Sequence, residues 1–237
     1  MDRIDTTPRR GFLARALGAA AAAALPASAG APAAAQTAPP GADSWIREVK
    51  GVHRCLFDFP QHKYGFPLLH ILNYLNTYGS AYKTKAVGAV GTFYSIGTDA
   101  SIPLAFNDAM WSKYALGDYL GLKDSAGRPY TRNVFHRPTK EDAHLLGQAA
   151  KIPAIPALAE AVPAMGIENL QRMGTKFLLC ANALGAWVLE LEARGKGKAA
   201  DIEKELRANV LAGVTIVPAM VIAIEQAQAA GIRYNRQ

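Results

Sequence analysis

Two cysteines, Cys55 and Cys180, are the residues of this chain best suited to covalent chemistry. Cys180 ends the apolar run TKFLLC and is followed by ANALGAWVLELEARG, which has the pattern of a helix. A thiol at the start of a helix lies near free backbone N–H groups, which favour the nucleophilic thiolate. A small thiol in an apolar run is also ordinary core packing. The residues alone leave both interpretations of Cys180 open.

Polar residues near two other strand ends are candidates for binding a ligand. Asp58 ends the first β-rich run, where it could accept from a helix N-terminus, orient a basic partner, or cap a helix. His62 follows in the turn QHKYGF, and Asn182 lies two residues after Cys180. A metal site needs at least three converging ligands, so His62 and His70 alone do not predict one. We expect His62 to be a ligand-binding or a capping residue.

Arg128 and Arg132 lie in the loop segment SAGRPYTRN and are candidates for contacts with an anion. A guanidinium group can hold a carboxylate or phosphate through two parallel hydrogen bonds. A solvated loop is the alternative interpretation. The phosphate-loop spacing and the G-x-G-x-x-G spacing are both absent from the sequence, so no motif names a nucleotide or other cofactor.

The two cysteines are not expected to bond to each other, although a disulfide is the first idea for a chain with only two cysteines. Cys55 comes early in HRCLFDF, whereas Cys180 comes last in TKFLLC. In parallel neighbouring strands these positions lie near opposite ends of the sheet. An offset of several residues, at about 3.3 Å each, exceeds the roughly 7 Å that a disulfide spans between Cα atoms.

Strand-like and helical segments alternate, which predicts a three-layer α/β fold with a mainly parallel, five-stranded, flavodoxin-like sheet. The predicted helices span 66–79, 181–195 and 219–231, and another ends near Gly174. The predicted strands are 52–60, 86–94, 175–180, 213–218 and 232–235. In such folds ligands bind beyond the carboxyl ends of the strands. We therefore expect Asp58, His62, Cys180 and Asn182 at one edge of the sheet.

A long segment, residues 93–166, interrupts this alternation after the second strand and is predicted to be a helical insertion. It is too rich in aromatic residues for a disordered linker, with Trp111, Tyr119 and Tyr130 among them. We expect an ordered subregion that covers one end of the sheet or forms a contact between subunits. Aromatic side chains that a small domain leaves exposed would favour self-association.

The first residues have the pattern of an export signal. Arg9 and Arg10 precede Gly-Phe-Leu, an alanine-rich stretch and small residues, which is typical of a twin-arginine signal peptide spanning 1–35. Residues 36–50 then form a flexible lead-in to one domain, 51–237. No segment is apolar enough for a membrane span. The signal predicts a periplasmic protein. The formal net charge is +7, but Lys and Arg do not form a block, so no binding to nucleic acid is expected.

Two segments resemble the carboxyl half of the DsrE/DsrF-like sulfur-relay proteins. They are IENLQRMGTKFLLCANALGAWVLE and ELRANVLAGVTIVPAMVIAIEQAQAAGIRYN, which together cover about residues 167–235. In that family a helix ending in glycine precedes a strand that closes on a cysteine. The resemblance implies a compact α/β fold whose subunits associate. It also implies that Cys180 carries sulfur as a persulfide.

Two classes of function follow. The first is a sulfur carrier or sulfurtransferase, in which Cys180 receives sulfur from a donor protein and passes it to an acceptor. The second is a non-catalytic module of the same fold that binds a small ligand or assembles as a homo-oligomer, with Cys180 as packing.

Overall fold

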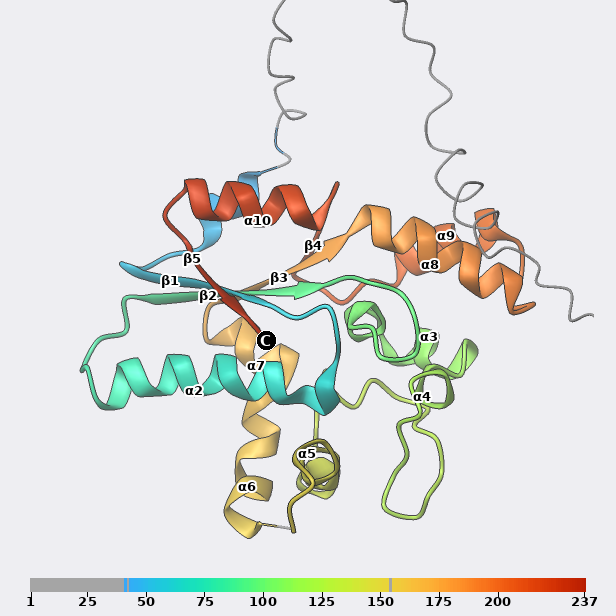
Figure 1. Ribbon diagram of the computed structural model, residues 1–237, viewed down its shortest axis with the longest axis horizontal. Helices are drawn as coiled ribbons and strands as arrows, with labels where there is room; N and C mark the ends of the chain where they lie inside the picture. Colours follow the sequence, from blue (N-terminus) through green and yellow to red (C-terminus); the bar gives the residue numbers. More distant parts are fainter. Residues whose placement is uncertain (1–40, 42, 154) are drawn as a thin grey trace, which may run out of the picture. The chain divides into compact units, whose positions relative to one another are not determined.

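One parallel sheet of five strands organises the chain (Figure 1). The computed structural model describes residues 41, 43–153 and 155–237, so the predicted signal peptide lies outside the described residues. The strands are β1 (His53–Asp58), β2 (Val87–Phe93), β3 (Thr175–Cys180), β4 (Val214–Val217) and β5 (Arg233–Arg236). Their order is β4-β3-β2-β1-β5, and all four pairings are parallel.

Helices cover both faces of the sheet, as expected for parallel strands (Figure 1). One face packs against α2 (Phe66–Ser80), α7 (Ile167–Arg172), α8 (Ala181–Ala193) and α9 (Ala199–Ala208). The other face packs against α10 (Met220–Ala229) and η1 (Ser44–Glu48). Trp45 of η1 is fully buried, so residues 44–49 are packed on the sheet and are not the flexible lead-in that was expected. Because crossovers between parallel strands are right-handed, the helices that connect β1 to β2, β2 to β3 and β3 to β4 lie on one face. The connection from β4 back to β5, which contains α10, lies on the other. The predicted three-layer α/β fold is confirmed.

Alternating side chains along each strand divide the core into two clusters. On β1, Cys55 and Phe57 belong to the cluster under α2, whereas Leu56 faces α10. Cys180 belongs to the α10 cluster, so the two cysteines lie on opposite faces of the sheet. Both are free thiols, which confirms the prediction that they do not pair. The sheet itself separates them, in addition to the offset along the strands.

The insertion after β2 is a helical subregion. Its helices are η3 (Ile102–Ala105), α3 (Asp108–Lys113), α4 (Leu116–Tyr119), η4 (Lys140–Ala143), α5 (His144–Ala150), α6 (Pro156–Ala161) and η5 (Val162–Met165). Asn133 is 2 % exposed and holds this subregion together, since its amide donates to the carbonyls of Leu104 and Phe106 at 2.9 and 2.7 Å. Gly117 allows a close crossing, because a Cβ there would lie 2.1 Å from the carbonyl oxygen of Tyr130.

The aromatic side chains of the insertion are largely buried or hydrogen-bonded within the protomer. Trp111 is fully buried, and its indole N–H donates to the carbonyl of Pro103 at 3.0 Å. Tyr119 is half-buried and donates to both carboxylate oxygens of Glu190 at 3.0 Å. The expectation that the domain does not fully bury these side chains is therefore wrong for Trp111, whereas Tyr119 does remain partly exposed. None of the helices in the described ranges combines the length and apolarity of a membrane span.

Candidate functional site

Cys180 is the last residue of β3 and the N-cap of α8, so it stands at the carboxyl edge of the sheet. Its Sγ accepts a hydrogen bond from the amide of Ala183 at 3.4 Å. It also accepts from the amide of Met220, the first residue of α10, at 3.3 Å. Two helices thus begin at one sulfur atom. Amide donors and the positive ends of two helix dipoles stabilise negative charge on that sulfur.

The amides that donate to Cys180 are not those of the two residues that directly follow it in the chain. A side chain at the N-cap position reaches the second or third amide of its helix, and here that is Ala183. Asn182 is exposed, and its backbone N–H donates to the carbonyl of Pro218 at 3.3 Å instead. The second donor, Met220, follows the fourth strand, whose end was expected at this edge. The sequence did not indicate that its amide would point at the thiol.

The surroundings of Cys180 are apolar. The residue is 5 % exposed and packs in the α10 cluster with Leu178, Val217 and Met220. Tyr94, which follows β2, packs against the same cluster. The thiol is therefore shielded from bulk solvent.

Cys55 has none of these features. It lies within β1, and burial raises the pKa of its thiol from 9.0 to about 11. Its Sγ is placed to donate to the carbonyl of Leu56, at 3.8 Å. A thiol with this pKa is almost entirely protonated at neutral pH and is a poor nucleophile. The two thiols therefore differ: Cys180 accepts hydrogen bonds from two backbone amides, whereas burial keeps Cys55 in its neutral form.

Asp58, the last residue of β1, is the buried centre of a partly exposed cluster of hydroxyl groups on the α10 face. One carboxylate oxygen accepts from the hydroxyl of Tyr94 at 2.8 Å and from Thr92 at 3.4 Å. The other accepts from the hydroxyl of Tyr234 at 2.7 Å. Asp58 is 2 % exposed, and these donors replace the water that its charge would otherwise need. It neither caps a helix nor pairs with a basic group in this arrangement.

The Asp58 cluster joins three strands at the carboxyl edge. Tyr234 is on β5, Tyr94 follows β2, and Asp58 ends β1 between them. Burial, and then the hydrogen bond to Asp58, raise the pKa of Tyr94 far above its usual value, so its hydroxyl keeps its proton. Tyr94 touches both this cluster and the apolar cluster of Cys180. Asp58 and Cys180 are therefore placed on the same face of the sheet, with Tyr94 in contact with both groups.

His62 caps the short helix η2 (Lys63–Gly65) in the loop between β1 and α2, which confirms the capping interpretation. It is 4 % exposed, and its Nδ1 accepts from the amide of Tyr64 at 3.0 Å. This bond supports a tight turn in which Lys63 and Tyr64 have φ angles of 39° and 55°, in the left-handed region. Burial outweighs the nearby charge of Asp99 and lowers the pKa of His62 from 6.5 to about 4.

His62 makes stability depend on pH in the acid range. The unfolded chain binds a proton at this residue below pH 6.5, whereas the folded chain does so only near pH 4. The stability that neutral His62 contributes is therefore full above pH 6.5 and is lost as the pH falls toward 4, by about 3 kcal/mol. Urea unfolding at pH 7 and pH 4 should give a smaller pH effect for His62→Asn, which keeps a capping acceptor. An equal loss in the variant and the wild type would contradict this assignment.

Arg128 and Arg132 lie in the insertion and pair with carboxylates there. Arg128 contacts Asp124 at 2.8 Å, and Arg132 contacts the buried carboxylate of Asp142 at 2.6 Å. Both line a cavity formed within the insertion, which Cys180 does not line. The structure thus groups Cys180 with Asn182 and, through Tyr94, with Asp58, but it does not bring the two arginines to them. No cluster of three or more possible metal ligands occurs among the residues described.

The fold and the site define a three-layer α/β protein with a buried thiol at the carboxyl edge of a five-stranded parallel sheet. No family model matches the sequence, and no curated protein matches it. Among solved structures, the chain is similar to a protein of unknown function, MTH1491 from Methanobacterium thermoautotrophicum. The two are 18 % identical, and the alignment covers 78 % of this chain and 99 % of the other, with a TM-score of 0.35.

Proposed function

We propose that this protein is a periplasmic sulfur carrier of the DsrE/DsrF-like kind, in which Cys180 forms a persulfide. The observation that carries the proposal is the pair of amide donors from Ala183 and Met220 to one sulfur atom. A sulfur carrier needs a thiolate to attack and a persulfide anion to be held until transfer. Two helix N-termini that meet at Sγ favour both anions.

The proposed transfer is balanced without an external oxidant. The Cys180 thiolate attacks the outer sulfur of a donor persulfide, and the S–S bond of the donor breaks as the new S–S bond forms. The donor leaves as a thiol after taking up a proton. In the second half of the cycle an acceptor thiolate attacks the outer sulfur on Cys180 and releases the Cys180 thiolate. The sulfane sulfur keeps its oxidation state throughout.

A donor and an acceptor protein are part of the proposal, and so are export and self-association. The arginine pair at residues 9 and 10 supports export to the periplasm. Exposed apolar side chains support a contact between copies: Leu189 on α8 is 60 % exposed and Val221 on α10 is 73 % exposed. These side chains replace Trp111 and Tyr119 as the expected contact residues.

The second candidate is a non-catalytic module in which Cys180 is packing. Its support is the 5 % exposure of Cys180 and the apolar side chains around it. A buried thiol that no donor can reach would serve only to fill the core. The two candidates differ in one measurable property, the ability of the folded protein to take up sulfane sulfur.

The test is sulfur loading of the folded protein followed by cyanolysis. The protein is incubated with polysulfide near neutral pH, freed of the reagent by gel filtration, and treated with cyanide, which removes persulfide sulfur as thiocyanate. The proposal predicts one thiocyanate per chain. No thiocyanate, from protein that is folded by circular dichroism, would favour the packing module.

A further inference from the structure

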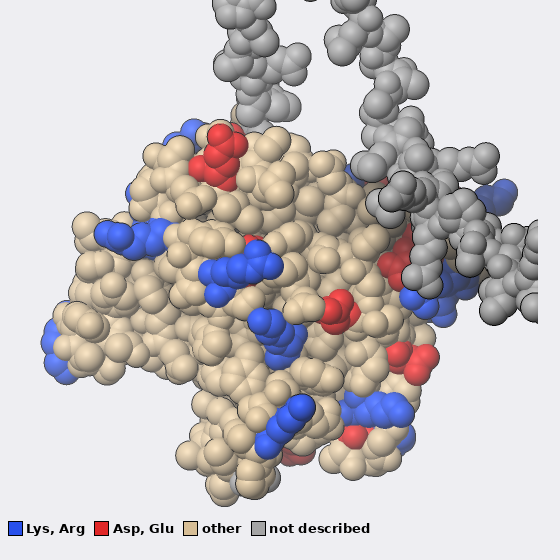
Figure 2. All heavy atoms as spheres, in the orientation of Figure 1, with Lys and Arg blue, Asp and Glu red and all other residues tan. Residues whose placement is uncertain are grey.

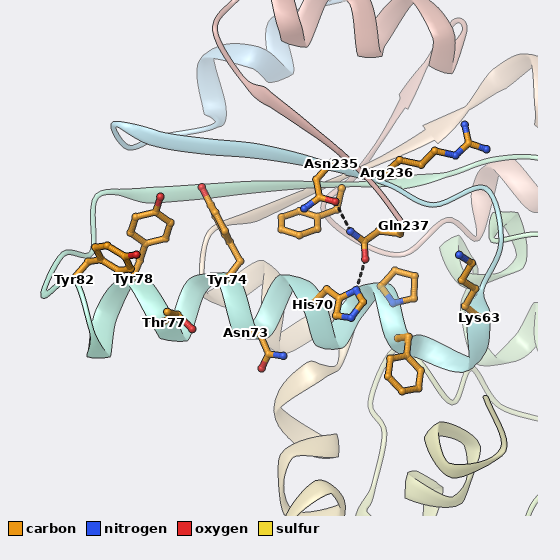
Figure 3. A pocket seen from close by; sticks show the side chains of 13 residues that line it. Lys63, His70, Asn73, Tyr74, Thr77, Tyr78, Tyr82, Asn235, Arg236 and Gln237 are labelled. Atoms are coloured by element: carbon orange, nitrogen blue, oxygen red, sulfur yellow. Dashed lines mark hydrogen bonds between the residues drawn. The ribbon is translucent and has the colours of Figure 1, made fainter. Parts of the chain in front are cut away.

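A groove of about 720 Å³ runs between α2 and β5, away from the thiol (Figure 3). Its floor and walls combine aromatic rings of α2 with polar groups at the end of β5. Asn235 and Gln237 face α2 in this view, and Gln237 bonds to His70 across the groove. Nothing in the proposed sulfur chemistry uses this groove.

One wall of the groove is an open edge of the sheet. β5 is the last strand in the order β4-β3-β2-β1-β5 and pairs only with β1 within the described chain. All four of its residues are exposed, from Arg233 to Arg236. An edge strand of this kind presents unpaired backbone N–H and C=O groups to which another extended chain can add.

The other wall is a ladder of tyrosine rings along α2. Tyr74 and Tyr78 on α2, and Tyr82 two residues beyond its end, follow one another at intervals of four residues, with ring centroids 5.0 and 5.1 Å apart (Figure 3). Tyr82, at the end of the ladder, is 69 % exposed. Because alternate side chains of a strand point to the same face, a strand added beside β5 would direct every second side chain toward this ladder.

The charge of the groove favours an acidic partner strand. Lys63 and Arg236 line it, and none of its thirteen lining residues is Asp or Glu. Arg233 is a further cation next to the groove, on the face of β5 toward α2, whereas the side chain of Arg236 points away from α2 (Figure 3). Neither arginine nor Lys63 forms a salt bridge within the described residues. Figure 2 shows Lys and Arg at the centre and left of the face on which β5 lies in front, whereas most acidic side chains in this view lie to the right.

We propose that the edge of β5 and the tyrosine ladder of α2 bind an extended acidic segment of a partner protein, which adds to the sheet as a sixth strand. Its backbone would pair with β5, and its apolar side chains would face the ladder. The carboxylates between them would lie on the opposite face of the sheet, beside Arg236. A second copy of β5 fits less well, because two such strands would bring four guanidinium groups together. This proposal is independent of the chemistry at Cys180.

The test uses a short peptide of alternating glutamate and valine with blocked ends, and binding is measured by calorimetry at low salt. Controls are the same peptide with lysine in place of glutamate, and one with N-methyl groups on alternate amides. The full-length protein should bind the glutamate peptide only. Arg236→Glu should weaken that binding about tenfold or more and create binding of the lysine peptide. Tyr82→Ala should weaken binding of the glutamate peptide several-fold.

Arg172→Glu is the matched control, since Arg172 is an exposed arginine at the end of α7, outside the lining of the groove. It should leave the affinity for the peptide unchanged. Equal binding of the lysine peptide, equal loss in the Arg172 variant, or no binding of the glutamate peptide would overturn the proposal. So would a dimer in sedimentation experiments that is lost in Asn235→Pro, because that result assigns the edge to a second copy.

Discussion

Replacement of Cys180 by serine is expected to abolish the loading of sulfane sulfur completely. A serine hydroxyl can accept from the amides of Ala183 and Met220 but cannot form a persulfide. The two side chains are similar in size, so the free energy of unfolding should fall by only about 1 kcal/mol. Thiocyanate released by cyanolysis and urea unfolding, measured on the same preparation, separate the loss of chemistry from a loss of fold.

Cys55→Ala is the matched control for this result. Cys55 lies on the opposite face of the sheet, and burial raises the pKa of its thiol to about 11. The variant should therefore load as much sulfur as the wild type. Full loading in Cys180→Ser, or a loss of loading in Cys55→Ala, would contradict the assignment of the carrier thiol.

Truncation of Trp111 to alanine is expected to cause the largest loss of stability, about 3–5 kcal/mol. Trp111 is fully buried in the insertion, packs edge to face on Phe135, and donates to the carbonyl of Pro103. Its removal leaves a cavity and an unpaired carbonyl. A domain with an ordinary stability of about 5–15 kcal/mol would lose a large share of it. The measurement is the midpoint and slope of urea unfolding.

Tyr82→Ala is the comparison for this measurement, because it also removes a large aromatic side chain but one that is 69 % exposed. Its effect on the free energy of unfolding should be within about 0.5 kcal/mol. A loss below about 1 kcal/mol in Trp111→Ala would mean that the insertion unfolds independently of the sheet. In that case the insertion could not serve as a fixed cover at the edge.

The elements that the sequence predicts well have a local cause. β3 spans 175–180 as expected, because a continuous apolar run between Gly174 and a helix is typical of a buried parallel strand. α2 follows from leucines at helical spacing behind Pro67. α9 was not predicted as a separate helix, although Ile202 and Leu206 form the buried stripe that marks it. The charged residues between Ile202 and Leu206 made this helical spacing hard to recognise in the sequence.

The site could be predicted only in part, because its contacts join distant segments. The position of Cys180 at a helix start follows from neighbouring residues. The amide of Met220 lies forty residues further along the chain, and its direction depends on how α10 crosses the sheet. Asp58 meets Tyr234 through the pairing of β1 with β5, a strand order that no periodicity encodes. The carboxylate partners of Arg128 and Arg132 depend on the local folding of the insertion.

The most direct test of the central claim is to locate the sulfur on the wild-type chain. The folded protein is loaded from polysulfide, alkylated at neutral pH without unfolding, digested without reductant, and read by tandem mass spectrometry. The proposal predicts that the alkylated peptide with Cys180 carries the mass of one additional sulfur atom and that the peptide with Cys55 is unmodified until the protein is unfolded. Additional sulfur on Cys55, or an unmodified Cys180, would contradict the proposal that Cys180 is the sulfur carrier.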